Sequence, residues 1–263
     1  SSAAPSPAPQ NIKISNIDNS SVSISWQTPS PSLGFVTFGQ NNATDETALD
    51  ERDATKPQTH WIHYVTLKNL LPKTTYQYKI ISGKITSETL QFTTAPEQKT
   101  QNNLRPIIGT VSDGENPLEE GIAFVVISGG SLQSSLVKSS GNFLIPLAKL
   151  KKTDLSDIYS LNEQTTAKLT IISAKGESSI LFTVNPNGIT FPPIKINENL
   201  DLTTPQLSPT SETKVYDINN DGKINAVDYS MAQKNKDKII NNILIDQAYL
   251  DKLTDMINTL NPN

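Results

Sequence analysis

Alternation of apolar and polar residues with a period of two is the feature that most restricts the fold of this chain. Between residues 11 and 97, apolar side chains recur at every second position in short runs, such as Val22, Ile24 and Trp26. This alternation is typical of strands that bury one face. The same alternation of apolar and polar residues recurs between residues 104 and 200. The predicted fold class is therefore mainly β, with two tandem antiparallel β-sandwiches followed by a small α-helical module.

Composition divides the chain of 263 residues into five segments. Residues 1–10 are rich in Pro, Ser and Ala and predict a flexible leader, of the kind that follows a removed targeting segment or membrane anchor. The two β-domains are expected at 11–97 and 104–200. Residues 201–213, rich in Pro, Ser and Thr, predict a linker before a last module at 214–263.

Two helices are predicted in the last module, at 226–233 and 245–260. In the second, Ile245, Ala248 and Leu250 begin an apolar series at roughly helical spacing. This stripe is most simply the core of the module. A surface for a partner remains the alternative.

Before the first of these helices, oxygen-bearing side chains fall at positions one, three, five, nine and twelve of one loop: Asp217, Asn219, Asp221, Asn225 and Asp228. Gly222 occupies position six, and the carbonyl of Lys223 follows at seven. This spacing predicts a calcium loop in which Asn225 binds through water and Lys223 through its backbone oxygen. The alternative is a polar turn without metal, because Asn, Asp and Gly also favour turns.

The loop resembles the dockerin type, in which a calcium loop and its exiting helix lack an entering helix. Position twelve is Asp rather than the longer Glu, and Pro, Ser and Thr fill 203–213. A second repeat is degenerate: 245–249 aligns with 224–228, but no acid-rich loop precedes it. The resemblance implies attachment to a cohesin-like partner, with Ala226 and Val227 at positions ten and eleven forming the contact.

The first β-domain resembles a fibronectin type III domain, through residues 26–29, 70–78 and 92–96. The resemblance implies that Trp26 fills the core and that Tyr76 bonds back to the chain upstream, as a tyrosine corner. The stretch from 63 to 67 also resembles the module that precedes the catalytic domain of some metallophosphatases.

The second β-domain resembles the carboxypeptidase-regulatory, transthyretin-like sandwich, through residues 107–111 and 140–146. The turn at 117–121 is one residue longer than in that family. An insertion at 149–164 predicts one short helix after the capping residue Asp154.

His60 and His63 are the only histidines. Residues three apart on a strand point to opposite faces, which predicts separate solvated or packed imidazoles rather than joint ligands of one metal. Adjacent acids, such as Asp50 and Glu51, suit solvation better than acid–base catalysis. The chain also lacks nucleophile-elbow, Walker and zincin motifs, so we expect no enzyme activity, although a hydrolase with a site assembled in space stays open.

A net charge of −4 gives no reason to expect a nucleic-acid partner. Cysteine is absent, and no apolar run approaches a membrane span. The chain is therefore expected to be a non-catalytic, extracellular or cell-surface modular protein. Its calcium-stabilised end would mediate assembly with a cohesin-like module or with copies of itself. Subunits of an extracellular filament or sheath, and accessory modules of a secreted hydrolase, are the alternatives.

Overall fold

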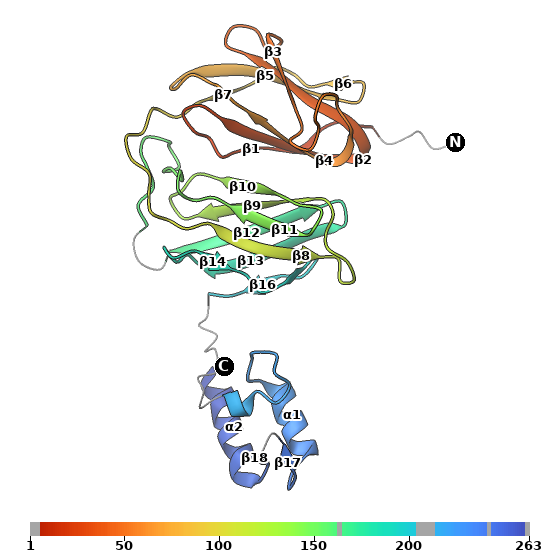
Figure 1. Cartoon of the computed structure of the whole chain (residues 1–263), viewed down its shortest axis with the longest axis vertical. Helices are drawn as coiled ribbons and strands as arrows, with labels where there is room; N and C mark the ends of the chain where they lie inside the picture. The colour runs from red at the N-terminus through yellow and green to blue at the C-terminus, as the bar shows by residue number, and fades with distance from the viewer. Residues whose placement is uncertain (1–5, 162–164, 204–213, 241–242, 261–263) are drawn as a thin grey trace, which may run out of the picture. The chain divides into compact units, whose positions relative to one another are not determined.

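The computed structural model describes residues 6–161, 165–203, 214–240 and 243–260 (Figure 1). The first five residues of the predicted leader and residues 204–213 of the predicted linker lie outside these ranges.

The chain divides into two compact units, 1–203 and 204–263. Strands dominate the first unit and two helices the second, so the predicted mainly-β fold class with a small helical end is confirmed. In the described ranges, no helix is long and apolar enough to cross a membrane.

The N-terminal sandwich contains the strands β1 (Gln10–Ser15), β2 (Val22–Gly39), β3 (Glu46–Leu49), β4 (Thr59–Leu67), β5 (Thr75–Ser82), β6 (Ile85–Thr86) and β7 (Leu90–Thr93). All the pairings in this sandwich are antiparallel. The first half of β2 lies between β1 and β4, and its second half lies between β3 and β5. One long strand therefore belongs to both layers.

The change of layer occurs where β2 contains Pro29 and Pro31. Its register with β4 shifts between Gln27 and Ser32. Proline has no amide hydrogen to donate to a ladder, so strand pairing is interrupted there. The strand nevertheless continues without a break from Val22 to Gly39, and the short strand β3 lies in the segment between β2 and β4.

Aromatic side chains organise the core of this sandwich. Trp26 is 1% exposed, and the amide of Leu71 donates a hydrogen bond to the hydroxyl of Tyr76 at 2.9 Å. The expected core tryptophan and tyrosine corner are therefore present, and the sandwich has a fibronectin type III-like fold. Gly34 is needed here because a Cβ at this position would collide with the rings of His63 and Trp26.

The second sandwich contains β8 (Ile107–Ser112), β9 (Gly121–Ile127), β10 (Gln133–Val137), β11 (Asn142–Ile145), β12 (Thr166–Ser173), β13 (Gly176–Thr183), β14 (Ile189–Thr190), β15 (Ile194–Lys195) and β16 (Leu200–Asp201). One sheet has the order β10-β9-β12-β13-β16, and the other is built around β8 with β11, β14 and β15. Side chains from both sheets, among them Phe143 and Phe182, form one buried cluster.

The helix predicted after Asp154 is not formed in residues 149–161. The carboxylate of Asp154 accepts the amide of Ser156 at 3.0 Å, and Leu155 has a φ of 61°. A local side-chain turn thus replaces the first helical turn. Residues 162–164 of the predicted insertion lie outside the described residues.

The two sandwiches share a small apolar cluster. Ile62 and Tyr64 of β4 pack with Ile122 and Phe124 of β9 and with Ile172 of β12. These side chains point outward from their own sheets, where a solitary sandwich would carry polar residues. Their burial explains why residues 1–203 form one compact unit.

Polar contacts surround this cluster. The side-chain amide of Asn16 donates to the hydroxyl of Tyr64 at 2.9 Å, while its carbonyl accepts the amide of Ser134 at 2.8 Å. On another side, Asp18 accepts hydrogen bonds at 2.7 Å from both Lys149 and Lys151. Burial alone would raise the pKa of Asp18, but the two lysines outweigh it and hold that pKa below its usual value.

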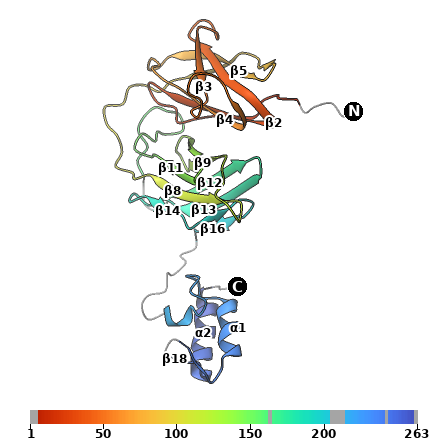
Figure 2. The same cartoon turned by 45° about the vertical axis from the view of Figure 1, so that its right-hand side comes forward.

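The C-terminal unit contains a 3-10 turn, η1 (Lys214–Tyr216), and then α1 (Ala226–Lys234), β17 (Ile239–Ile240), β18 (Ile243–Leu244) and α2 (Gln247–Leu260). Helices α1 and α2 lie side by side in both views (Figures 1 and 2). Ile224, Ile245 and Leu253 belong to its own buried cluster, so the apolar stripe of α2 is largely core. Both predicted helices are present, but the β17–β18 hairpin was not predicted.

Candidate functional site

The twelve-residue stretch from Asp217 to Asp228 is a tightly wound loop that leads into α1. Asp217 is 6% exposed, and its carboxylate accepts the amides of Asp221 at 3.1 Å and Gly222 at 2.9 Å. Asn220 and Gly222 have positive φ values of 55° and 81°. These left-handed residues turn the backbone so that its amides point at the first acid of the loop.

The last acid of the loop is fixed by the start of the helix. One oxygen of Asp228 accepts the amide of Ile218 and the other the amide of Asn225, both at 2.9 Å. Asn225 in turn accepts the amide of Val227 at 2.7 Å, so Asn225 and Asp228 form a capping box. Asp228 is fully buried. It therefore joins the beginning of the loop to the first turn of α1.

The remaining predicted ligands lie between these two ends. Asp221 accepts the amide of Lys223 and the side-chain amide of Asn219, both at 2.8 Å. Hard oxygen donors of this kind fit calcium. The three loop carboxylates do not all lie within 4.8 Å of one another. Among the described residues, only Asp50, Asp53 and His60 of the N-terminal sandwich form such a group. The assignment of the loop as a calcium site remains a prediction.

The C-terminal unit has two similar halves, residues 217–234 with α1 and residues 245–260 with α2. The second half repeats the plan of the first but lacks the oxygen-rich loop. Asp246 caps α2 by accepting the amide of Tyr249 at 2.8 Å, as Asn225 caps α1. Tyr249 stands where the alignment of 245–249 with 224–228 places Asp228. Its hydroxyl donates to the carbonyl of Val215 at 2.7 Å, and its ring packs on Tyr216 at 4.8 Å. An aromatic side chain thus replaces the closing acid.

The predicted partner-binding residues lie on the exposed side of α1. Ala226 is exposed, Val227 is 53% exposed, and Met231 one turn later is 36% exposed. These apolar side chains do not contribute to the core of the unit. They leave an exposed apolar surface on α1.

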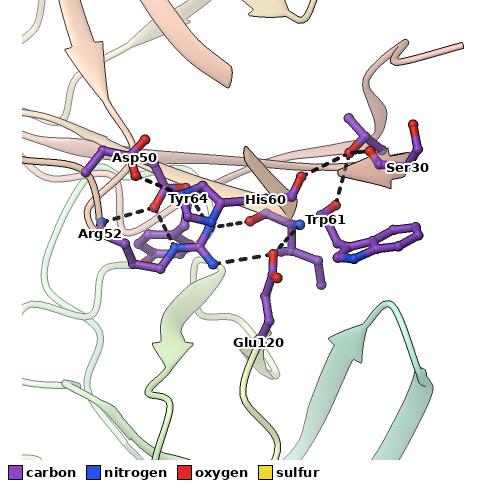
Figure 3. A network of polar contacts seen from close by, with 10 residues as sticks. Ser30, Asp50, Arg52, His60, Trp61, Tyr64 and Glu120 are labelled. Carbon is purple, nitrogen blue, oxygen red and sulfur yellow. Dashed lines mark hydrogen bonds and ion pairs between the residues drawn. The ribbon is translucent and has the colours of Figure 1, made fainter. Parts of the chain in front are cut away.

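A second polar cluster lies beside β4 in the N-terminal sandwich (Figure 3). One ligand atom from each of Asp50, Asp53 and His60 lies within 4.8 Å of the others. Asp50 is 1% exposed and forms a paired contact with Arg52, with a shortest distance of 2.7 Å. Arg52 also approaches Glu120 of the second sandwich at 3.4 Å. The expectation that Asp50 is a solvated loop acid is therefore wrong.

Hydrogen bonds explain why Asp50 is charged although it is buried. Burial alone would raise its pKa, but hydrogen bonds and charge from Arg52, with the amide of Tyr64, lower that pKa below its usual value. Asp50 begins a turn in which its carboxylate accepts the backbone amide of Arg52, two positions on, at 3.1 Å. That spacing is the one sequence signal for the pair. The Glu120 contact joins residues too distant in sequence for any local pattern.

The two histidines meet at this cluster. His60 pairs with Asp53 at 2.8 Å, and its ring lies 5.9 Å from that of His63 in an edge-to-face arrangement. His63 stacks on Trp26 at 4.6 Å, and burial lowers its pKa to about 4. The two rings are therefore neighbours, at a point where the pairing of β2 with β4 shifts between Gln27 and Ser32. Only His60 belongs to the close group of metal-ligating type among the described residues, so the expectation that the two histidines do not share one metal stays a prediction.

One protein-family profile matches part of the chain. The profile described as the N-terminal domain of purple acid phosphatase matches residues 9–94, which is the fibronectin-like sandwich. No curated protein matches the sequence significantly.

Several solved structures resemble parts of the chain. The sensor domain of the anti-sigma factor RsgI4 from Pseudobacteroides cellulosolvens is 20% identical, with a TM-score of 0.28, and the match covers 36% of this chain and 100% of that one. The domain from human fibronectin type III domain containing protein 3 is 23% identical, with a TM-score of 0.27 and coverage of 37% and 92%. PhoD is 12% identical, with a TM-score of 0.28 and coverage of 43% and 23%.

Proposed function

We propose that the chain is a non-catalytic modular protein of the cell exterior, whose C-terminal unit binds calcium and attaches it to a protein partner. The observation that carries this proposal is the oxygen-rich loop, wound around Asp217 and tied to α1 through Asp228. The two sandwiches act as a folded spacer that presents this unit. The partner is a cohesin-like module or a second copy of the chain.

Calcium suits the loop because Asp217, Asp221 and Asp228 bring three negative charges into one short segment. Their mutual repulsion opposes closure, and a divalent cation turns that repulsion into attraction. Only three acids, of which the closing one is Asp228 rather than a Glu, predict an affinity around 10⁻⁴–10⁻³ M, which is typical of extracellular modules. Such a site fills at millimolar calcium, and this is the reason for placing the protein outside the cell.

The exposed apolar side chains of α1 support the attachment. Val227 and Met231 lie one turn apart on the helix that the loop closes, so calcium binding and partner binding involve one element. Calcium would order α1 and thereby the surface that carries these residues.

Calorimetric titration of the full chain with calcium tests the first part of the proposal. We expect one equivalent to bind, and Asp217→Ala to abolish that binding. Asp113→Asn, which changes an acid of the second sandwich that pairs with Lys175 and lies outside the C-terminal unit, is the control and should bind calcium like the wild type. Absence of calcium binding by the wild type would refute the calcium assignment.

Analytical ultracentrifugation tests self-assembly. If the wild type forms oligomers in calcium and Val227→Lys does not, copies of this chain are the partner. A wild-type chain that stays monomeric with and without calcium would direct the search to a cohesin-like protein. If Val227→Lys then fails to capture that protein, the same surface of α1 is the binding site.

The match of residues 9–94 to the N-terminal domain of purple acid phosphatase favours a second candidate function. In this candidate the chain is an accessory module of a secreted hydrolase and positions a catalytic domain on another part of the same protein. Co-purification of phosphatase activity with the native protein would support it, and inactive native material would argue against it.

A further inference from the structure

A groove of about 930 Å³ lies where the two sandwiches meet. Residues of both sandwiches line it, among them Ser23 and Thr66 of the first and Leu144 of the second. Every residue of β10, from Gln133 to Val137, also lines the groove. Ligand sites are typically concavities of about 300–1,000 Å³ and are frequent at the junction of two domains. The groove is therefore large enough to hold several residues of an extended chain along β10.

Strand β10 is the end strand of its sheet, and among the described residues β9 is its one strand partner. Both main-chain groups of Ser134 face away from β9, because they bond to the side chain of Asn16. The amide of Ser134 donates to Oδ1 at 2.8 Å, and its carbonyl accepts Nδ2 at 3.1 Å. Residues of an antiparallel strand alternate between those that bond to the neighbouring strand and those that do not. The amide and carbonyl of Leu136, two positions on, therefore also face away from β9.

The outer edge of β10 is closed at one end and open at the other. Asn16 closes the first end, since its backbone amide also donates to the carbonyl of Leu132 at 3.0 Å. One residue thus supplies the hydrogen bonds that a neighbouring strand would make there. The carbonyl of Leu136 accepts the hydroxyl of Ser135 at 3.0 Å and has a second lone pair, and outside β9 no described residue accepts the amide of Leu136. An open strand edge of this kind is a template for another strand.

Apolar side chains lie beside the open part of the edge. Leu144 of β11 lines the groove and is 48% exposed, and Ile108, its direct partner on β8, is 39% exposed. Leu136 is only partly buried against the cluster that the two sandwiches share. A strand added to a sheet edge binds through its main chain, and contacts with its alternate side chains select its sequence. Leu136 and Leu144 fit a peptide that carries an apolar side chain at this point.

The charge of the groove favours a peptide over a charged polymer. Three carboxylates and three cations line it, namely Asp18, Glu51, Glu119, Arg52, Lys138 and Lys149. These charges balance, so the groove is complementary neither to a polyanion nor to a polycation. Among the described residues that line it, Tyr64 is the one aromatic, and it is 3% exposed. It offers no open ring face to a sugar, whereas a polypeptide carries neutral donors and acceptors at every residue.

We propose that this groove binds an extended peptide segment of a partner protein, which adds as a strand to the open edge of β10. The peptide accepts the amide of Leu136, donates to its carbonyl and places an apolar side chain against Leu144. Asn16 ends the added strand at Ser134 and thereby fixes its register. The groove belongs to the first compact unit, so its occupation does not require calcium, unlike the surface proposed on α1.

The test uses the full chain and a library of random heptapeptides displayed on phage. A peptide selected from the library is labelled, and its binding is measured by fluorescence anisotropy. We expect binding that a calcium chelator leaves unchanged. Methylation of the peptide nitrogens at one set of alternate residues should weaken binding at least about 10-fold, and methylation of the other set should not, because only one set faces β10. The amide of Leu136 should exchange slowly with solvent only when the peptide is bound, as measured by nuclear magnetic resonance.

Two variants change the two parts of the proposed contact. Leu136→Pro removes the outward amide without removing a bond to β9, and Leu144→Lys removes the apolar contact. Each should weaken binding at least about 10-fold. Leu144 is exposed, so this variant keeps the test valid if proline disturbs β10. Leu181→Lys is the matched control, because Leu181 is a 40% exposed leucine of the same sandwich that does not line the groove.

Several results would overturn the proposal. These are a library that yields no peptide binding to the wild type, binding that Leu144→Lys leaves unchanged, and binding that Leu181→Lys weakens equally. Tolerance of both methylated sets would show that the peptide main chain is not recognised. A wild-type dimer that Leu136→Pro dissociates, measured by sedimentation, would mean that a second copy occupies the groove. Binding of a neutral oligosaccharide that Leu144→Lys abolishes would assign the groove to a sugar instead.

Discussion

The two halves of the C-terminal unit have the same plan but hold their helices in different ways. Each half buries an isoleucine, Ile224 at 8% and Ile245 at 1% exposure, and each helix begins after a side-chain cap. At the next corresponding position, one half has Asp228 and the other Tyr249. Hydrogen bonds to a charged group hold α1, whereas apolar packing holds α2. We therefore expect α1, but not α2, to depend on calcium.

Tyr249→Ala should have the largest effect on the unit. Removing a buried aromatic side chain costs about 3–5 kcal/mol, which approaches the whole stability of a small domain. The helical signal of the unit should be lost with or without calcium, as measured by circular dichroism. Tyr249→Phe is the matched control and should lose only the hydrogen bond to Val215, about 1 kcal/mol. Intact helices in Tyr249→Ala would show that packing does not hold the second half.

Asp217→Ala should have the next largest effect, and only when calcium is present. Calcium at about 100 times its dissociation constant stabilises a folded site by about 2.7 kcal/mol. The variant should lose this increment in thermal unfolding, while Asp113→Asn keeps it. Equal stabilisation of the wild type and Asp217→Ala by calcium would place the ion elsewhere.

The two caps allow the halves to be compared directly. Asn225→Ala and Asp246→Ala each remove a side chain that accepts an amide at the start of a helix, and each should cost about 1 kcal/mol. Asn225→Ala should also weaken calcium binding, because Asn225 is the predicted water-mediated ligand at position nine of the loop. Asp246→Ala should not. If the two variants change calcium affinity equally, the claim that only the first half binds calcium is wrong.

Alkaline pH should destabilise the second half selectively. Burial, with the charges of Tyr216 and Asp228, raises the pKa of Tyr249 to about 12 from its usual 10.0. Folding therefore favours the neutral phenol, and this contribution is complete below pH 10 and lost as the pH rises to about 12. Unfolding of the wild type should become easier across this range. Tyr249→Phe should lack that component of the pH dependence.

Features that depend on local pattern could be predicted from the sequence. The alternation around Trp26 predicted a buried strand, and the resemblance of residues 70–78 to a fibronectin type III domain implied the tyrosine corner of Tyr76. The helix predicted at 226–233 was also found, as α1 (Ala226–Lys234). In each case the residues that interact lie within a few positions or follow one periodicity.

Features that depend on distant partners could not be predicted. Glu120 reaches the amide of Ile62 at 2.7 Å across 58 residues, and no local pattern announces this contact. The same holds for Asp18, whose lysines come from the second sandwich. The neighbouring rings of His60 and His63 were not predicted either, and they lie where the pairing of β2 with β4 shifts. The surroundings of these side chains are set by irregular strand pairing and by contacts between the two sandwiches.

Hydrogen exchange of the full chain, measured with calcium and then with a chelator, tests the central claim most directly. We predict that chelation greatly accelerates exchange in the loop 217–228 and in α1. Exchange in α2 should change much less, and exchange in the two sandwiches should not change. Exchange that is the same under both conditions throughout the C-terminal unit would show that the loop is only a polar turn, and would contradict the account.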